Sequence, residues 1–104
     1  MSDTQQFVKS QKLHTYDKVR EALVHTVLEK TLHSAGIYQT ITSEIERTYN
    51  CSLYDCYEHP EYFSSILENK HREMYDLVTG AINKQLEMFS HEKPIARFLQ
   101  AISS

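Results

Sequence analysis

Two cysteines and a histidine in one short stretch are the residues of this chain best suited to hold a metal ion. Cys51, Cys56 and His59 follow the spacing Cys-x4-Cys-x2-His. Thiolates and an imidazole suit zinc, and a turn before a helix can bring such ligands together. The spacing lacks a second close pair to complete four ligands. The alternative is that both cysteines pack as small hydrophobic residues among tyrosines, while His59 caps the following helix.

Tyrosines crowd the same stretch. Of the 7 tyrosines in the chain, Tyr54 and Tyr57 lie between Cys51 and His59, and Tyr62 follows shortly after His59. Tyrosine combines a large contact area with a polar end, which suits protein interfaces, so we predict an interaction surface at these three residues. The alternative is that they close a small core near a wet surface. We expect no enzyme, because no nucleophile, base and orienting group can be assembled from the spacing.

A second group of chemically useful residues lies earlier in the chain. Glu21, His25, Glu29 and His33 recur at every fourth position and so share one helix face. Carboxylates and imidazoles at this spacing can build a metal or acid–base site inside a helical bundle, but only when several helices contribute. Here one predicted helix carries the row, opposite its apolar face. A solvated stripe with modest pairing between neighbours accounts for it.

Composition limits the class of protein. The chain has 104 residues, enough for one domain with its own core, and its 2 glycines and 2 prolines argue against a fold with many β-hairpins. A net charge of −3 argues against generic nucleic-acid binding. Neither a signal peptide nor an apolar run of about 20 residues is present in the sequence. We therefore expect a cytoplasmic protein with free thiols and no membrane contact.

Apolar periodicity predicts a compact all-α bundle of four to five helices. Residues 1–14 carry few large apolar residues and are predicted to form a tail, with the helical bundle in residues 15–104. Thr15 or Asp17 is the expected N-cap of a long first helix that ends at Gly36. Apolar residues on one face of that helix begin at Val19.

Four more helices and a single helical turn follow. The second helix is expected to end near Asn50, and a single turn capped by Ser52 comes next. Pro60 and Pro94 suit the first turns of the third and fifth helices, and the fourth helix carries Gly80 inside an apolar pattern, where close approach of a neighbouring helix or ring would explain it. The predicted core residues are Leu23, Val27, Ile41, Ile45, Phe63, Ile66, Val78, Ile82, Phe98 and Leu99.

Three segments resemble a known family. They are Tyr49-Asn50-Cys51, the run Tyr57-Glu58-His59-Pro60-Glu61-Tyr62-Phe63, and Lys93-Pro94-Ile95. Together they look like the small helical output domain of the Nitrosopumilus type from ammonia-oxidising archaea, over about Val19 to Ile102. The resemblance implies a role in signal transduction or regulation, as a stand-alone output domain, and it carries over no catalytic residue.

We therefore expect a non-enzymatic regulatory or protein-interaction module that self-associates, most simply as a homodimer. The partner is then a protein or a second copy of the chain, without a cofactor. The alternative is a small metal- or ligand-binding helical domain that uses Cys51, Cys56 and His59 with zinc. Sensitivity of folding to chelators would distinguish the two, because a structural metal contributes folding free energy.

Overall fold

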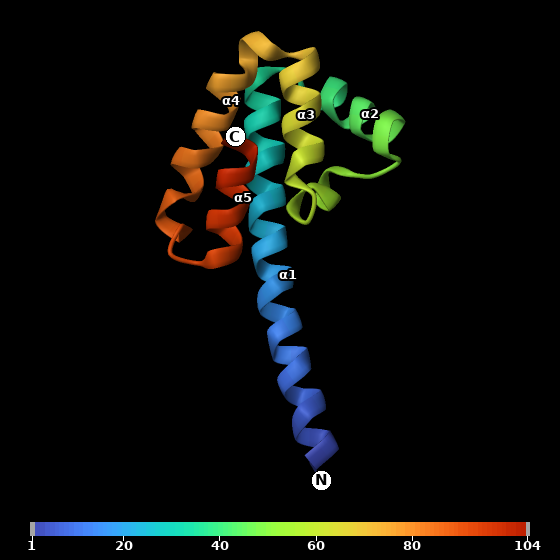
Figure 1. The fold of residues 1–104 in the computed structure, drawn as a ribbon, viewed down its shortest axis with the longest axis vertical. Coiled ribbons are helices and arrows are strands. Elements are labelled where there is room, and N and C mark those ends of the chain that lie inside the picture. Colours follow the sequence, from blue (N-terminus) through green and yellow to red (C-terminus); the bar gives the residue numbers. More distant parts are fainter. Residues whose placement is uncertain (1, 104) are drawn as a thin grey trace.

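The computed structural model describes the backbone of residues 2–103 and the side chains of residues 16–103. The described backbone holds five α-helices and two short 3₁₀ helices and contains no strand, which confirms the all-α bundle (Figure 1). The elements are α1 (Ser2–Ala35), α2 (Tyr38–Tyr49), η1 (Leu53–Tyr57), α3 (Pro60–Lys70), α4 (Arg72–Leu86), η2 (Glu87–Phe89) and α5 (Lys93–Ser103). Within the described part of the chain, hydropathy gives no helical segment able to span a lipid bilayer.

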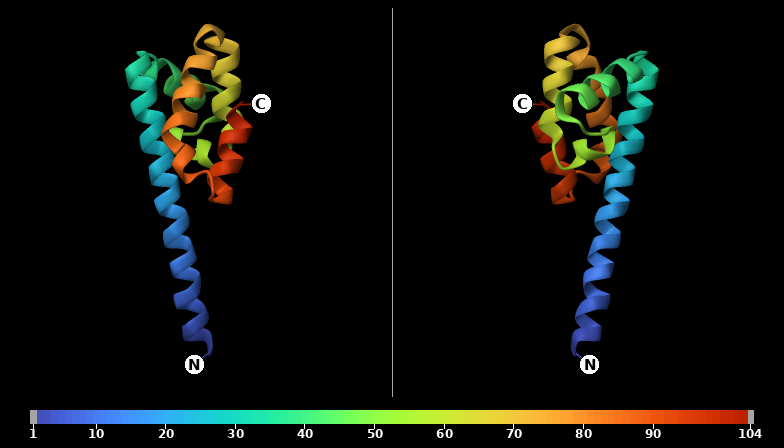
Figure 2. Two further views of the ribbon diagram at one scale, coloured as in Figure 1. Left: turned by 90° about the vertical axis from the view of Figure 1, so that its left-hand side faces the viewer. Right: turned by 90° about the vertical axis from the view of Figure 1, so that its right-hand side faces the viewer.

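Helix α1 is much longer than the sequence predicts. It begins at Ser2, so the predicted start at Thr15 or Asp17 is wrong. The physical reason is that no glycine or proline interrupts the chain before Gly36, and a helix that is already formed extends at little cost. Figures 1 and 2 show α1 continuing well beyond the other helices. The side chains of residues 1–14 lie outside the described residues, so a separate tail there stays a prediction.

Several other helix boundaries lie at residues that typically begin or end a helix. Gly36 has φ of 75° and Asn50 has φ of 55°, the left-handed conformation that ends a helix. Pro60 opens α3, where its missing N–H has no acceptor to lose. Ser52 precedes η1, and its backbone N–H donates to the Asp55 carboxylate at 2.8 Å. These local signals mark the ends of α1 and α2 and the starts of η1 and α3.

The core lies between α3 and the helices around it. Helix α3 packs against α2, α4, α5 and η1, while α1 packs against α4, η1 and α2. Nine of the ten predicted core residues are buried; Leu23 is half-buried and packs at the edge of the core. The sequence periodicity thus identified the interior well, because a buried stripe at helical spacing is a direct consequence of the fold.

Two large apolar residues on the helices face solvent instead of the core. Val19 is 61% exposed on α1 and Leu77 is 65% exposed on α4. The explanation expected for Gly80 is also wrong within this chain, since a Cβ added there would meet no atom within 4 Å. Each apolar arc is wider than the contact that one neighbouring helix can cover. The uncovered apolar residues are therefore available for contact with another molecule.

We expect Gly36→Ala to destabilise the protein by about 1–2 kcal/mol, because alanine pays a steric penalty in the left-handed conformation that Gly36 adopts. Denaturant unfolding measures this loss. Asn50→Gly is the matched control at the other left-handed position, and we expect it to change stability by less than about 0.5 kcal/mol. Equal losses in the two variants would show that the conformation at Gly36 is not what ends α1.

Candidate functional site

The structure does not assemble the predicted metal site. Both cysteines are free thiols: Cys56 is fully buried, whereas Cys51 is half-buried and donates to the Tyr49 carbonyl at 3.2 Å. Among residues 16–103, no group of three His, Cys, Asp or Glu side chains is arranged to hold a metal ion. Cys51, Cys56 and His59 therefore do not converge as a set of ligands, and this geometry lends the zinc hypothesis no support.

Histidine rings stack on tyrosines throughout this half of the bundle. His25 stacks on Tyr54 with ring centroids 3.7 Å apart, and His59 stacks on Tyr62 at 4.7 Å. Tyr62 also stacks on Tyr49, with ring centroids 4.0 Å apart. His59 occupies the N-cap position of α3, but its side chain makes no capping hydrogen bond, so the predicted capping role is wrong. These imidazoles serve as flat packing surfaces.

The row of acids and histidines on α1 has the same structural use. His25 Nε2 lies 3.8 Å from Glu29 Oε2, and His25 is half-buried because η1 packs against α1 there. His33 stacks on Tyr38 of α2, with ring centroids 3.9 Å apart. The row is therefore only partly solvated, in contrast to the predicted solvated stripe. Tyr54, the partner of His25, comes from η1, far along the chain, so the spacing on α1 cannot reveal this contact.

The three tyrosines predicted as one interaction surface lie in three different settings. Tyr54 is 46% exposed, with one face of its ring against His25. Tyr62 is half-buried in its stacked group, and Tyr57 is half-buried with its hydroxyl donating to Asp17 Oδ1 at 3.2 Å. Of the three, Tyr54 offers the most free surface. No contact in the structure tests whether a partner binds there, so this surface stays a prediction.

The buried thiol of Cys56 gives the protein a pH dependence. Burial, followed by the nearby Asp55 carboxylate, raises the pKa of Cys56 from 9.0 to about 12. The unfolded chain therefore releases this proton at lower pH than the folded chain. Between these two pKa values the unfolded state binds fewer protons than the folded state. The contribution of Cys56 to the free energy of unfolding is therefore fully present below about pH 9 and is lost as the pH rises towards 12.

We therefore expect the urea midpoint to fall between about pH 8 and about pH 10.5. The fall should be smaller in Cys56→Ala than in the matched control Cys51→Ala, because the first variant removes the group whose ionisation is suppressed by folding. Equal pH dependence in both variants would show that Cys56 ionises in the folded protein as it does in the unfolded chain.

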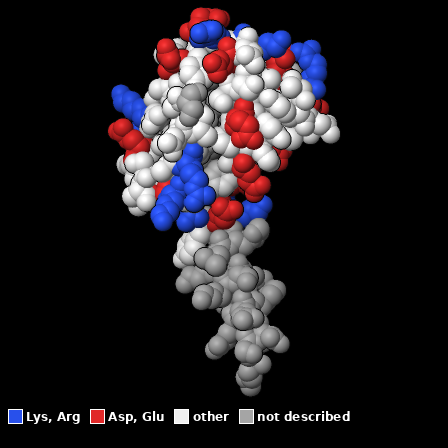
Figure 3. Space-filling view, in the orientation of Figure 1, with Lys and Arg blue, Asp and Glu red and all other residues white. Residues whose placement is uncertain are grey.

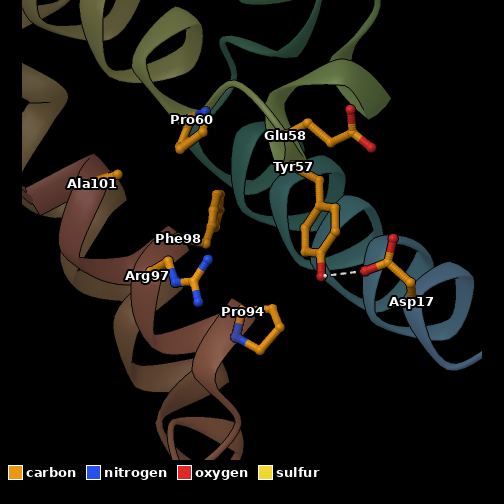
Figure 4. A pocket seen from close by; sticks show the side chains of 8 residues that line it. All are labelled: Asp17, Tyr57, Glu58, Pro60, Pro94, Arg97, Phe98 and Ala101. Atoms are coloured by element: carbon orange, nitrogen blue, oxygen red, sulfur yellow. Dashed lines mark hydrogen bonds between the residues drawn. The ribbon is translucent and has the colours of Figure 1, made fainter. Parts of the chain in front are cut away.

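A pocket of about 530 Å³ lies where α1, the end of η1, the start of α3 and α5 meet (Figure 4). Pro60, Pro94 and Phe98 provide apolar walls, and Arg97 and Asp17 provide opposite charges. Figure 4 shows the Arg97 guanidinium on one side of the pocket and the Tyr57 hydroxyl with Asp17 on the other. Its volume lies within the range of small-molecule sites.

An apolar groove of about 460 Å³ runs between α1 and α4. Leu77, Val78 and Ala81 form one wall, and α1 contributes the other, with Gln85 donating to Thr31 Oγ1 at 2.9 Å across it. An ion pair also joins α1 to the segment after α4: Arg20 Nε lies 3.3 Å from Glu92 Oε1. These two contacts fix α4 and the segment after it antiparallel to α1, as Figures 1 and 2 show.

Sequence reasoning missed both of these surfaces. The pocket joins Asp17 to Arg97 across the length of the chain, and no spacing rule links residues so far apart. The outward position of Leu77 had a weak signal, since it lies about 100° around the helix from Val78 and away from Ile82. That offset allows an exposed stripe beside the buried one.

Comparison with known proteins gives no matching family model, no matching curated protein and no matching solved structure. The likeness to archaeal output domains therefore rests on the sequence motifs around His59 and Pro94, and its functional implication stays a prediction.

Proposed function

We propose that this chain is a non-enzymatic regulatory or protein-interaction module that self-associates as a homodimer through α4. The observation that carries the proposal is the exposure of apolar side chains on α4, beside its groove with α1. Leu77 is 65% exposed and lines this groove together with Val78 and Ala81. Grouped apolar side chains on a surface are typical of protein contacts. The resemblance to output domains supports a regulatory role for that contact.

The outward face of α4 is open to close approach by another helix. Asp76, Gly80 and Lys84 recur at every fourth position, so they share one face, and all three are exposed. The space above Gly80 is free of atoms from the rest of the chain. Among residues 16–103, no ion pair or side-chain hydrogen bond involves the Asp76 carboxylate or the Lys84 ammonium group.

Charge complementarity supports a second copy of this chain as the partner. An antiparallel crossing of two α4 helices at Gly80 relates position 84 of one copy to position 76 of the other. A two-fold axis therefore sets each Lys84 against an Asp76, so that both charges find partners. Leu77 lies next to Gly80 in both copies and supplies apolar contact. At ordinary crossing angles the helix ends diverge, which confines the contact to the turns around Gly80.

Charge reversal tests this arrangement. Lys84→Asp and Asp76→Lys should each weaken dimerisation at least about tenfold, because each replaces two attractive pairs by two repulsive ones. The double variant restores opposite charges and should recover most of the lost affinity. Sedimentation equilibrium measures all three, with Lys93→Asp as a control that makes the same charge change on α5. Failure of the double variant to recover would contradict the two-fold crossing at Gly80.

The tyrosine surface is the competing contact, and the same measurement separates the two. We expect Tyr54→Ala to leave the dimer intact, because its ring already packs on His25 within one chain. Loss of the dimer in Tyr54→Ala, with no effect of the α4 variants, would move the interface to η1.

A further inference from the structure

We infer that the pocket between α1 and α5 binds a free α-amino acid with an apolar side chain, with Arg97 holding its carboxylate and Asp17 its ammonium group. The three parts of such a ligand need a cation, an anion and an apolar wall in one cavity. The pocket supplies the cation from α5, the anion from α1, and the apolar wall from α3 and α5 (Figure 4). This inference is independent of self-association through α4.

The cationic side of the pocket is Arg97. Acidic and basic side chains are interspersed on the face of the molecule that Figure 3 shows. Among residues 16–103, no ion pair or side-chain hydrogen bond involves the Arg97 guanidinium group. The neighbouring arginine of α1, Arg20, differs in this respect, because it pairs with Glu92 at 3.3 Å. A guanidinium presents paired N–H donors that match a carboxylate with two parallel hydrogen bonds. Arg97 is thus available to receive a carboxylate.

The anionic side of the pocket is Asp17, held in place by Tyr57. The Tyr57 hydroxyl donates to Asp17 Oδ1 at 3.2 Å, which occupies one of the carboxylate's several acceptor positions and leaves others open. Burial and the adjacent Asp17 raise the pKa of Tyr57 to about 12, so the hydroxyl keeps its proton and remains a donor at neutral pH. Glu58 also lines the pocket, but its carboxylate points away from Arg97 in Figure 4.

The apolar walls are rigid. Phe98 is only 2% exposed and so is fixed by the core, while Pro60 and Pro94 lie in the first turns of α3 and α5, where the proline ring fixes φ. Preformed walls of this kind reduce the entropy lost on binding. Because Arg97 lies on one side of the pocket and Asp17 on the other, a ligand that carries only one charge would leave one of these two groups without a partner.

The test is an NMR titration of the full-length protein with L-phenylalanine and with L-leucine, together with two phenylalanine analogues. N-acetyl-L-phenylalanine lacks the ammonium group, and phenethylamine lacks the carboxylate. We expect saturable shifts at the backbone amides around Tyr57, Arg97 and Ala101 with at least one of the two amino acids. Each analogue of phenylalanine should bind at least about tenfold more weakly than the parent.

Variants assign the two charges. Arg97→Gln and Asp17→Asn should each weaken amino-acid binding at least about tenfold, and Lys93→Gln and Glu61→Gln, which remove the same charges outside the pocket, should not. Unchanged far-ultraviolet circular dichroism confirms that each variant is folded. No saturable binding of either amino acid at millimolar concentration would overturn the inference. Equal binding of N-acetyl-L-phenylalanine or of phenethylamine would overturn it too, because one of the two charged groups would then play no part.

Discussion

Replacing Phe63 with alanine is expected to destabilise the protein by about 3–5 kcal/mol, a large part of the stability of a domain of this size. Phe63 is fully buried, and it lies on α3, the helix that packs against α2, α4, α5 and η1. Truncation leaves a cavity in the core beside the helix that four other elements contact, and these elements cannot all move inward at once. The loss is therefore both of transfer free energy and of packing.

Urea unfolding of Phe63→Ala measures the effect. Phe89→Ala is the matched control, because Phe89 is only half-buried in the 3₁₀ turn after α4 and should cost clearly less. A loss below about 1 kcal/mol for Phe63→Ala would show that α3 is not the centre of the core.

The second large effect concerns which face of α1 enters the core. Leu28→Asp should abolish cooperative folding, because it places a carboxylate with no partner at a position that is 0% exposed. Val19→Asp, on the same helix, should fold normally, since Val19 is 61% exposed. Both substitutions introduce the same charge and the same low helix propensity, so the difference between them isolates burial.

Thermal unfolding followed by circular dichroism distinguishes the two variants. We expect a cooperative transition in Val19→Asp and none in Leu28→Asp. The opposite pattern would mean that α1 is rotated about its axis relative to the other helices.

The helical class and most of the core could be predicted from sequence because both depend on local periodicity. Ile41 and Ile45 on α2, Phe63 and Ile66 on α3, and Val78 and Ile82 on α4 are pairs at helical spacing, and the faces that they share are buried. Gly36 marks a helix end through its backbone freedom alone. Such signals need no knowledge of which helices are neighbours.

The candidate sites could not be predicted in the same way, because they depend on contacts between distant segments. The ring of Tyr54 stacks on His25, and the hydroxyl of Tyr57 donates a hydrogen bond to Asp17. A stretch rich in cysteine and tyrosine therefore resembles a ligand site in sequence while much of it serves internal packing. Conversely, Arg97 lies in a plain amphipathic helix, and only the fold brings it to a pocket beside α1.

The central claim, self-association through α4, is tested most directly by a native mass spectrum of freshly purified protein without added metal or chelator. The account predicts a species of two subunits, each of 12.2 kDa, that dissociates on dilution and is reduced in Lys84→Asp. A single subunit at every concentration up to high micromolar would contradict it, as would a dimer that Lys84→Asp leaves unchanged.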